Sequence, residues 1–304
     1  MLIGIIGQSF TGKTTLTNYL KEKLQFKELY INEPTQPLNF ESLTEAINYA
    51  TTHWQDQMVI KNIHYYEGYQ IAMKRPFFLL IGIHSPLTLH EYFNCMKNQQ
   101  LQSSITFPNQ SQSLYELMNK TNLSILNDKD NLIEYYKILN QIDFCNKEYL
   151  RPSWDTYFLA LCELASKRSN CMKRRVGCIL VSDYRVISTG YNGTPKGLRN
   201  CNEGGCGRCN GNASCGQGLD QCICMHAEEN ALLEAGRERI TNRNVTIYCN
   251  TCPCLGCTRK IIQVGIVEVV YTLDYGMDQI AARLFKEAGI TLRQVKPTEI
   301  ELVR

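Results

Sequence analysis

Apolar and polar residues alternate along the chain in a way that predicts an α/β fold, most clearly after residue 150. Ser153 can cap a helix whose apolar residues recur at intervals of three and four. We expect this helix to bury the side chains of Trp154, Tyr157, Phe158, Leu161 and Leu164. Two strands are predicted next, VGCILVS at 176–182 and VISTGYN at 186–192, with a turn at 183–185 between them.

Helix and strand patterns then alternate to the end of the chain. A loop rich in Gly, Cys and Asn leads to a helix at 226–235, and further helices start near Cys254 and Asp278. Apolar segments typical of strands separate them: NVTIYCN at 244–250, EVVYTL at 268–273 and TLRQV at 291–295. This order predicts a three-layer α/β/α sandwich in which helices cover a five-stranded mixed sheet.

The first 150 residues have the pattern of a separate α/β domain. LIGIIG at 2–7 predicts a buried strand that runs into a polar loop and a helix, and RPFFLLIGIHSP at 75–86 predicts a later strand. Residues 99–131 are rich in Gln, Asn and Ser, which is typical of a mobile insertion. A boundary near residues 145–153 divides the chain into domains 1–150 and 151–304.

Composition supports two globular domains and limits where the protein is found. The chain has 304 residues, of which 44% are hydrophobic and 20% charged. MLIGIIG has no basic flank, and no apolar run approaches the roughly 18 residues of a membrane span. We therefore expect a soluble protein of the cytoplasm, present in the nucleus as well if its activity is needed there. Thirteen of the fifteen cysteines lie between Cys162 and Cys257, which favours thiols and metal ligands over disulfides.

Charge favours a small anionic substrate over a polymer. The net charge is +3, with 12 basic and 14 acidic residues up to residue 150 and 20 and 15 after it. The longest basic run, Lys173–Arg174–Arg175, is sufficient for one or two phosphates but too short for a nucleic-acid arm. We expect neither nucleic acid nor a membrane as a partner.

Three residues of the second domain predict an open zinc site. His226 precedes a helix, and Cys254 and Cys257 form a C-x-x-C pair at the start of another. Zinc takes four ligands, so three from the protein leave a position for water, whose pKa falls to about 7 in such sites. Glu228 lies two positions from His226 and is placed to move protons between that water and a substrate nitrogen.

A loop before His226 carries six further cysteines, at positions 201, 206, 209, 215, 222 and 224. A closed four-thiolate zinc site would hold so glycine-rich a segment in one path, because metal binding supplies the folding energy that an apolar core does not. Cys206 and Cys209 form a C-x-x-C chelate within this pool. The alternative is a loop of free thiols. Cys162, Cys178 and Cys249 fall in helix or strand patterns and are expected in the core.

The N-terminal segment matches a phosphate-binding loop. Gly7-x-x-x-x-Gly12-Lys13-Thr14 follows a predicted strand and precedes a predicted helix. In such loops backbone N–H groups surround phosphates, the lysine neutralises them and the hydroxyl of the next residue reaches Mg²⁺. This pattern predicts a P-loop fold that binds a nucleoside triphosphate with Mg²⁺.

Together these residues resemble the deoxycytidylate deaminase family, and its fungal members in particular. The resemblance covers about residues 151–304, a cytidine-deaminase-like region. It rests on H-x-E followed by P-C-x-x-C and on the segments RPSWDTYF, RSNCMKRRVGC, TGYNGTPKG, HAEENALLEAG and EVVYTLDY. It implies zinc-dependent hydrolysis of dCMP to dUMP and ammonia, which supplies thymidylate synthesis. It also implies a homo-oligomer, typically a hexamer, activated by dCTP and inhibited by dTTP.

The resemblance implies roles for individual residues near the zinc. His226, Cys254 and Cys257 are similar to the catalytic zinc ligands, and Glu228 to the proton carrier. The backbone N–H of Ala227 is expected to approach the pyrimidine carbonyl.

It also implies residues that hold the sugar, the phosphate and a second zinc. Asn192 is similar to the sugar-binding asparagine, although a turn residue before Gly193 is an equal alternative. Lys173 and Tyr275 match positions that hold the substrate phosphate. Related deaminases with a second, structural zinc place its ligands at positions that match Cys171, Cys201, Cys206 and Cys222, with Cys209 competing as the chelate partner of Cys206.

The first domain resembles nucleoside kinases only in part. INEPTQPLNF is similar to a segment of deoxynucleoside kinases whose glutamate acts as base, which makes Glu33 a candidate, and RPFFLLIGIHSP is similar to a strand of dephospho-coenzyme A kinases. The sequence has no arginine-rich lid and no Asp-Arg-Ser motif, which favours a nucleotide-binding or assembly role. The alternatives are a bifunctional enzyme with an active kinase, a nucleic-acid editing deaminase and a zinc-stabilised binding protein without catalysis.

Overall fold

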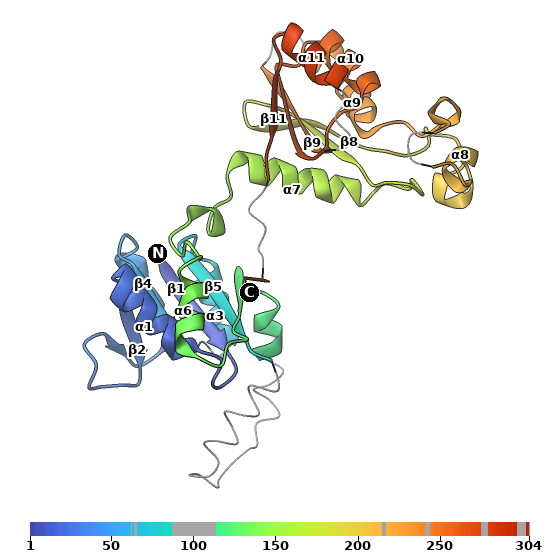
Figure 1. Ribbon diagram of the computed structural model, residues 1–304. Helices are drawn as coiled ribbons and strands as arrows, with labels where there is room; N and C mark the ends of the chain where they lie inside the picture. The colour runs from blue at the N-terminus through green and yellow to red at the C-terminus, as the bar shows by residue number, and fades with distance from the viewer. Residues whose placement is uncertain are drawn as a thin grey trace. The chain divides into compact units, whose positions relative to one another are not determined.

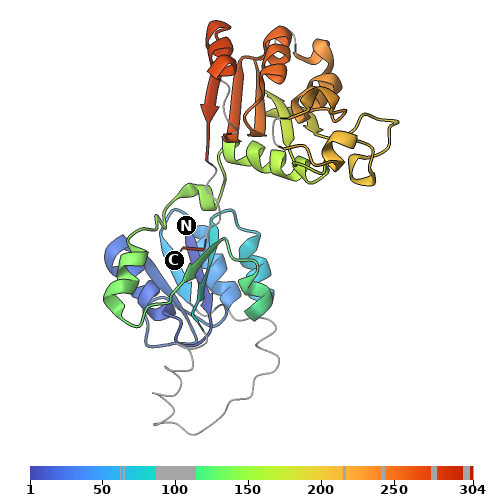
Figure 2. The same ribbon diagram turned by 45° about the vertical axis from the view of Figure 1, so that its right-hand side comes forward.

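The chain forms two compact units, Met1–Arg151 with Glu299–Arg304, and Pro152–Thr298. The structure is a computed structural model (Figures 1 and 2). It describes residues 1–61, 63, 66–86, 114–214, 217–240, 244–274, 279–296 and 302–303. Each unit has its own sheet and its own core.

The first unit is built on a parallel sheet. Its strands lie in the order β12-β6-β5-β1-β4-β2-β3, and every pairing is parallel. The strands are β1 (Leu2–Gly7), β2 (Lys27–Ile31), β3 (Asn39–Phe40), β4 (Met58–Lys61), β5 (Phe78–His84), β6 (Leu123–Leu126) and β12 (Leu302–Val303). The helices between them include α1 (Lys13–Leu24), α2 (Leu43–Thr52), α3 (Tyr66–Met73) and α6 (Leu132–Leu139), and the short 3-10 helix η1 (Lys147–Tyr149) follows.

Strand alternation sends the side chains of β1 to two cores. Ile3 and Ile5 pack with residues of α1 and α6 on one face, whereas Leu2 and Ile6 pack with residues of α2 and α3 on the other. Both faces of the strand are buried, which explains its unbroken apolar run. The unit is therefore a three-layer α/β/α domain.

The C-terminal strand β12 belongs to the sheet of the first unit. Leu302 and Val303 pair in parallel with Ser124 and Ile125 of β6. The predicted second domain, 151–304, is therefore wrong for the last residues, because Glu299–Arg304 belong to the first unit. Two residues of strand at a sheet edge leave no pattern in the sequence that would assign them to a particular sheet.

The second unit contains a five-stranded mixed sheet in the order β11-β10-β9-β7-β8. In chain order its elements are α7 (Trp154–Ser166), β7 (Gly177–Ser182), β8 (Arg185–Tyr191), η2 (Cys201–Glu203), α8 (Gly207–Asn210), η3 (Leu219–Gln221), α9 (Ala227–Ile240), β9 (Val245–Thr251), α10 (Leu255–Val264), β10 (Glu268–Leu273), α11 (Gln279–Glu287) and β11 (Thr291–Gln294). Strand β7 runs antiparallel to both of its neighbours, and the remaining pairs are parallel. The predicted sheet is confirmed.

Helices cover both faces of this sheet (Figures 1 and 2). Helices α9, α10 and α11 pack on one face through a core that includes Ala231, Ile261 and Phe285. Helix α7 packs on the other face through Phe158, Leu159 and Cys162. Ser153 caps α7 as predicted, since its hydroxyl accepts a hydrogen bond from the backbone N–H of Thr156.

The buried face of α7 differs from the predicted one. Trp154, Tyr157 and Leu164 are 45%, 44% and 61% exposed, while Leu159 and Cys162 are buried. The prediction gave too much weight to the aromatic residues. The set of side chains predicted to be buried therefore lies to one side of the helix face that packs on β7. Gly177 of β7 explains the close approach, because a Cβ there would lie 1.9 Å from the carbonyl oxygen of Cys162.

Candidate metal centre

Three predicted zinc ligands meet where two helices begin. His226 directly precedes α9, Cys254 is the N-cap residue of α10, and Cys257 lies in the first turn of α10. The Nδ1 atom of His226 lies 3.4 Å from the Sγ of Cys254 and 3.3 Å from the Sγ of Cys257. The three ligand atoms all lie within 4.8 Å of one another. Two thiolates and an imidazole are ligands that zinc prefers, so the donor set fits this ion.

Contacts around the start of α9 hold His226 in place. The backbone N–H of His226 donates to the carboxylate of Glu229 over 2.8 Å, which is one half of a capping box. The same carboxylate forms an ion pair with Lys260 of α10. The two helix starts that carry the ligands are therefore tied to each other.

The packing of α9 on β8 depends on a glycine. A Cβ at Gly190 would lie 2.1 Å from the carbonyl oxygen of Ala227 and 2.5 Å from the backbone nitrogen of Ala231. Asn230 also donates from its side-chain nitrogen to the carbonyl oxygen of Tyr191 over 2.6 Å. The first turn of α9 is thus fixed directly against the sheet.

The pKa values of the two cysteines shift in opposite directions. Hydrogen bonds with Cys257 and His226 lower the pKa of Cys254 to about 3. The hydrogen bond with Cys254 and burial raise the pKa of Cys257. The N-terminus of α10 also favours negative charge at this point. Cys254 is therefore favoured as a thiolate, the form in which a cysteine binds a metal ion.

Glu228 lies beside these ligands with its carboxyl group almost completely buried. The residue is 4% exposed and interacts with the sulfur of Cys257. Burial raises the pKa of this carboxyl group. A carboxyl group that is easier to protonate and touches the metal-ligand set is suited to accept and return a proton.

Asn192 lies at the end of β8 and is 8% exposed. Its side-chain oxygen accepts from the backbone N–H of Val176 over 2.8 Å, and its side-chain nitrogen donates to the carbonyl oxygen of Arg174 over 3.0 Å. These bonds fix the segment that follows Lys173. The second N–H of the amide group is not used by either of them, so the predicted contact with a sugar stays a prediction.

Two of the three other residues predicted to bind the substrate lie in the described part of the chain. Ala227 is buried in the first turn of α9. Lys173 is exposed at its amine, which donates to the carbonyl oxygens of Gly211 and Ala213 over 3.1 and 3.3 Å. It therefore tethers the cysteine-rich loop in this structure. Tyr275 lies outside the described residues, and its role in binding phosphate stays a prediction.

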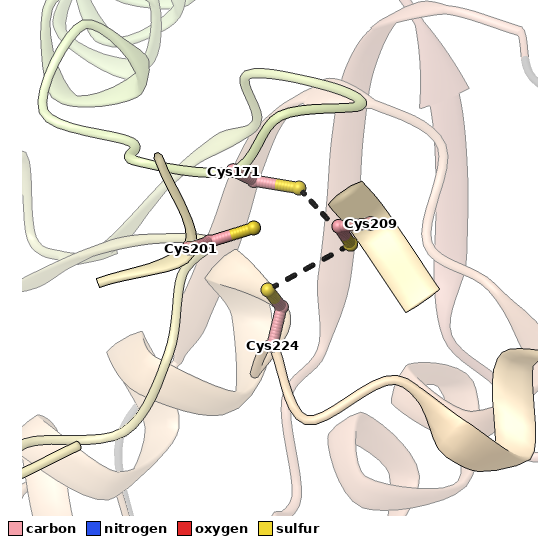
Figure 3. Close-up of side chains that lie close together, drawn as sticks. All are labelled: Cys171, Cys201, Cys209 and Cys224. Atoms are coloured by element: carbon pink, nitrogen blue, oxygen red, sulfur yellow. Dashed lines mark hydrogen bonds between the residues drawn. The ribbon is translucent and has the colours of Figure 1, made fainter. Parts of the chain in front are cut away.

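The cysteines predicted to hold a second zinc ion form two groups with their neighbours, and neither group is the predicted set. Cys171, Cys201, Cys209 and Cys224 form one group of sulfurs, all within 4.8 Å of one another (Figure 3). Cys206, Cys209, Cys222 and Cys224 form a second group by the same measure. The predicted set of Cys171, Cys201, Cys206 and Cys222 is not brought together as one site.

Cys224 belongs to both groups but was not among the predicted ligands. The resemblance to deaminases with a second zinc drew attention to a single cysteine before the histidine and suggested Cys222. The C-x-C spacing of Cys222 and Cys224 was the available signal. Cys215 lies outside the described residues.

The predicted phosphate-binding loop joins β1 to α1. Gly12 is the N-cap residue of α1 with φ of 104°, and a Cβ there would lie 2.9 Å from the side-chain nitrogen of Asn127. The amine of Lys13 folds back over the loop and donates to the carbonyl oxygens of Gly7 and Gln8 over 3.0 and 2.6 Å. Burial lowers the pKa of this amine.

Two further residues of the first unit were predicted to act with this loop. Thr14 is exposed in the first turn of α1. Glu33 is exposed beyond the end of β2, where its backbone N–H donates to the side chain of Asn39 over 2.6 Å. Neither residue is placed in contact with Lys13 by the described hydrogen bonds.

Comparison with known proteins identifies the family. Residues 152–273 match the cytidine and deoxycytidylate deaminase zinc-binding region. The chain is 44% identical over 318 residues to the deoxycytidylate deaminase of Schizosaccharomyces pombe, which covers 98% of each chain. The chain belongs to the deoxycytidylate deaminase family. It is an enzyme, a hydrolase that deaminates its substrate.

Members of the deoxycytidylate deaminase family differ in how much of this chain they match. The enzyme of Saccharomyces cerevisiae is 39% identical over 323 residues and again covers 98% of each chain. A solved dCMP deaminase of the cyanophage S-TIM5, in complex with dCMP and dUMP, is 26% identical. It covers 48% of this chain and 98% of its own, with a TM-score of 0.39. The similarity to the two yeast enzymes thus includes the first unit.

None of the helices in the described part of the chain combines the length and the apolar character needed to cross a bilayer.

Proposed function

We propose that this family member hydrolyses dCMP to dUMP and ammonia with one zinc ion held by His226, Cys254 and Cys257. The observation that supports this most directly is the three-ligand set with the buried carboxyl group of Glu228 beside it. Three ligands leave a position for water and substrate, which distinguishes catalytic from structural zinc sites. When bound, zinc would acidify a water molecule enough for it to react near neutral pH.

Glu228 carries the proton transfers in this proposal. Its raised carboxyl pKa lets it take one proton from the attacking water and deliver it to the pyrimidine nitrogen. It then takes the second proton, from the hydroxyl group formed by the attack, and delivers it to the amino group, which leaves as ammonia. The backbone N–H of Ala227 holds the pyrimidine carbonyl, because a residue without a larger side chain lets the ring approach the start of α9. Asn192 bonds the sugar, and Lys173 and Tyr275 bind the phosphate.

We also propose that the enzyme is regulated by nucleotides, which its family membership supports. We expect dCTP with Mg²⁺ to activate and dTTP to inhibit a homo-oligomer, expected as a hexamer. Sigmoidal dependence of the rate on dCMP should become hyperbolic with dCTP. A rate that responds to neither nucleotide would contradict this part of the proposal.

We also propose that the first unit binds a nucleoside triphosphate without efficient phosphoryl transfer. Strand β1 lies between β4 and β5: the chain runs from β1 to β2, β3 and β4 on one side of β1 and then crosses to β5 and β6 on the other. Ligands of open parallel sheets bind at such a switch point, beyond the carboxyl ends of the strands, where Gly7 to Gly12 lie. The start of α1 supplies free N–H groups and Lys13 supplies charge.

A second candidate for this unit is a working kinase with Glu33 as its base. The intact Gly7-x-x-x-x-Gly12-Lys13-Thr14 pattern is the observation that favours it. Binding of a triphosphate with Mg²⁺ by the full chain should be abolished in Lys13→Ala, measured by titration calorimetry with the deaminase site blocked. Phosphorylation that depends on Lys13 would favour the kinase, and no binding at all would reject both candidates.

One assay tests the deaminase proposal. Ammonia release is measured from dCMP, dCTP, deoxycytidine and a cytosine oligonucleotide, each with and without dCTP as activator. We expect release from dCMP to dominate. A preference for the oligonucleotide would instead support an editing deaminase.

A further inference from the structure

The loop at 199–224 packs around sulfur instead of around hydrocarbon. Cys201, Cys206 and Cys209 are buried, and Cys171, Cys222 and Cys224 are half-buried against them. Among the described residues this core consists of cysteines alone. The aliphatic side chains of Leu219 and Ile223 in the same loop are 59% and 42% exposed. Apolar burial therefore does not explain how this segment keeps its path.

The two sulfur groups share an edge. Cys209 and Cys224 belong to both, and their sulfurs lie 3.9 Å apart. Cys171 lies 3.9 Å from Cys209 in one group, and Cys222 lies 3.6 Å from Cys209 in the other. In Figure 3 the four sulfurs of the first group point toward a common centre.

These distances match those expected for zinc tetrahedra. A zinc–sulfur bond of about 2.3 Å gives a sulfur–sulfur edge of about 3.8 Å in a regular tetrahedron. The pair Cys206 and Cys222, at 3.9 Å, agrees with this value as do the shared pair and the pairs with Cys209. A disulfide would require sulfurs at about 2.05 Å.

We infer that this loop holds two zinc ions bridged by the sulfurs of Cys209 and Cys224. Cys171 and Cys201 complete the coordination of one ion, and Cys206 and Cys222 complete that of the other. The six thiols lose six protons to solvent, and two Zn²⁺ ions leave the cluster with a net charge of −2. A single zinc ion would use only one group and leave two cysteine thiols in contact with it.

Polar groups around the sulfurs suit a negatively charged cluster. The backbone N–H of Met172 lies 3.5 Å from the sulfur of Cys201. Backbone N–H groups of Lys173 and Arg174 point to the sulfur of Cys171, and those of Cys209 and Ile223 to the sulfur of Cys206. N–H groups donated to thiolates are a regular part of cysteine metal sites and stabilise their charge.

The cluster joins the two segments that enter the deaminase site. Cys224 precedes His226 by two residues, and Met225 between them exchanges backbone hydrogen bonds of 3.2 and 2.8 Å with Gly193. On the other side, Ser169 near Cys171 donates to the carbonyl oxygen of Asn192 over 2.8 Å. The two ions therefore support the positions of His226 and Asn192 without taking part in the reaction.

Metal content and X-ray absorption of the full-length protein test this inference. We expect about three zinc ions per chain by mass spectrometry under native conditions, one of them catalytic. Zinc K-edge absorption should contain a zinc–zinc contribution shorter than about 3.5 Å, since two tetrahedra that share a sulfur–sulfur edge hold their centres close together on either side of it. Two ions per chain, or three without that contribution, would overturn the bridged cluster. Three disulfides among the six cysteines would also overturn it.

Variants separate the cluster from the catalytic site. Cys224→Ser should lower the content by two ions, while Cys254→Ala should lower it by one and keep the zinc–zinc contribution. Cys145→Ser is the matched control, because Cys145 is a half-buried cysteine of the first unit, and it should keep all three ions. If Cys224→Ser does not fold, the wild-type count and absorption still decide. The inference does not depend on the proposed substrate, so the ammonia assay and these measurements can fail separately.

Discussion

Two cysteine-containing sites lie next to each other along the chain and are built in opposite ways. His226, Cys254 and Cys257 sit at the starts of two helices that pack on a sheet through an aliphatic core. The sulfurs of Cys201, Cys206, Cys209, Cys222 and Cys224 belong to a loop whose described residues pack around sulfur. Where the fold already supplies rigidity, three ligands are sufficient and one position stays open for chemistry. Where the fold does not supply rigidity, protein ligands occupy all the coordination positions, and the free energy of metal binding stabilises the folded loop.

The largest expected effect comes from removing a ligand where the fold is rigid. Cys254→Ala should abolish ammonia release, because the two remaining ligands do not retain zinc. Circular dichroism should stay that of the wild type, since the sheet and its core do not depend on this ion. A variant that unfolds would show that both sites depend on metal in the same way, and the comparison would be wrong.

The next prediction separates the role of the Glu228 carboxyl group from that of the zinc ion. Glu228→Gln keeps the size of the side chain but removes its ability to accept a proton, so kcat should fall at least about 100-fold with zinc retained. Steady-state kinetics and zinc analysis of the same preparation check this. Glu229→Gln is a control in the same helix turn. It should lose less activity, because Glu229 accepts a hydrogen bond from the backbone of His226 and has no role in the proposed proton transfers. Near-normal turnover by Glu228→Gln would reject the assigned role.

A third test addresses the loop alone. Chelation should expose Arg208, which lies within α8 between Cys206 and Cys209, to trypsin. We expect its cleavage rate to rise on the order of 10-fold, because local unfolding governs proteolysis of such segments. Peptide mapping against time measures it, with sites in α7 as the internal reference. Equal cleavage before and after chelation would mean that the loop holds its path without metal.

The smallest effect concerns the face of the sheet away from the catalytic site. Arg293 of β11 donates to Asp155 of α7 over 2.7 and 3.1 Å and lowers the pKa of that carboxyl group. A lowered pKa stabilises the fold above the unfolded value of about 3.9, and this stability is lost as pH falls below it. Asp155→Asn should cost about 1 kcal/mol at pH 7 and less near pH 3, measured by urea unfolding. A cost independent of pH would assign the effect to packing.

Much of the second unit could be predicted because its signals are local. His226 with Glu228, and Cys254 with Cys257, are two or three residues apart, so one helix start places each pair. The order of helices and strands followed from the apolar periods in the same way. Asp183 and Tyr184, with φ of 50° and 60°, form the turn between β7 and β8 where the polar break in the pattern predicted it.

What could not be predicted depends on contacts between distant segments. Which sulfurs meet is decided by the folded path of the loop, so the resemblance to deaminases with a second zinc suggested Cys222 and missed Cys224. The exposed face of α7 depends on the close approach at Gly177, which a helical period does not contain. The pairing of Leu302 with β6 needs the edge of a sheet formed some 180 residues earlier.

Because the end of the chain pairs with β6, the catalytic unit is inserted within the sequence of the first unit, the candidate nucleotide-binding domain. Both of its ends continue into the first unit, at Arg151–Pro152 and at Thr298–Glu299. A fragment that contains only residues 1–150 therefore lacks a strand of its own sheet and presents a bare edge, a common cause of aggregation. To produce the first unit with all of its strands, Pro152–Thr298 must be removed and the flanking ends joined by a short linker. A label attached after Arg304 reports on the first unit, although in the linear sequence it follows the second.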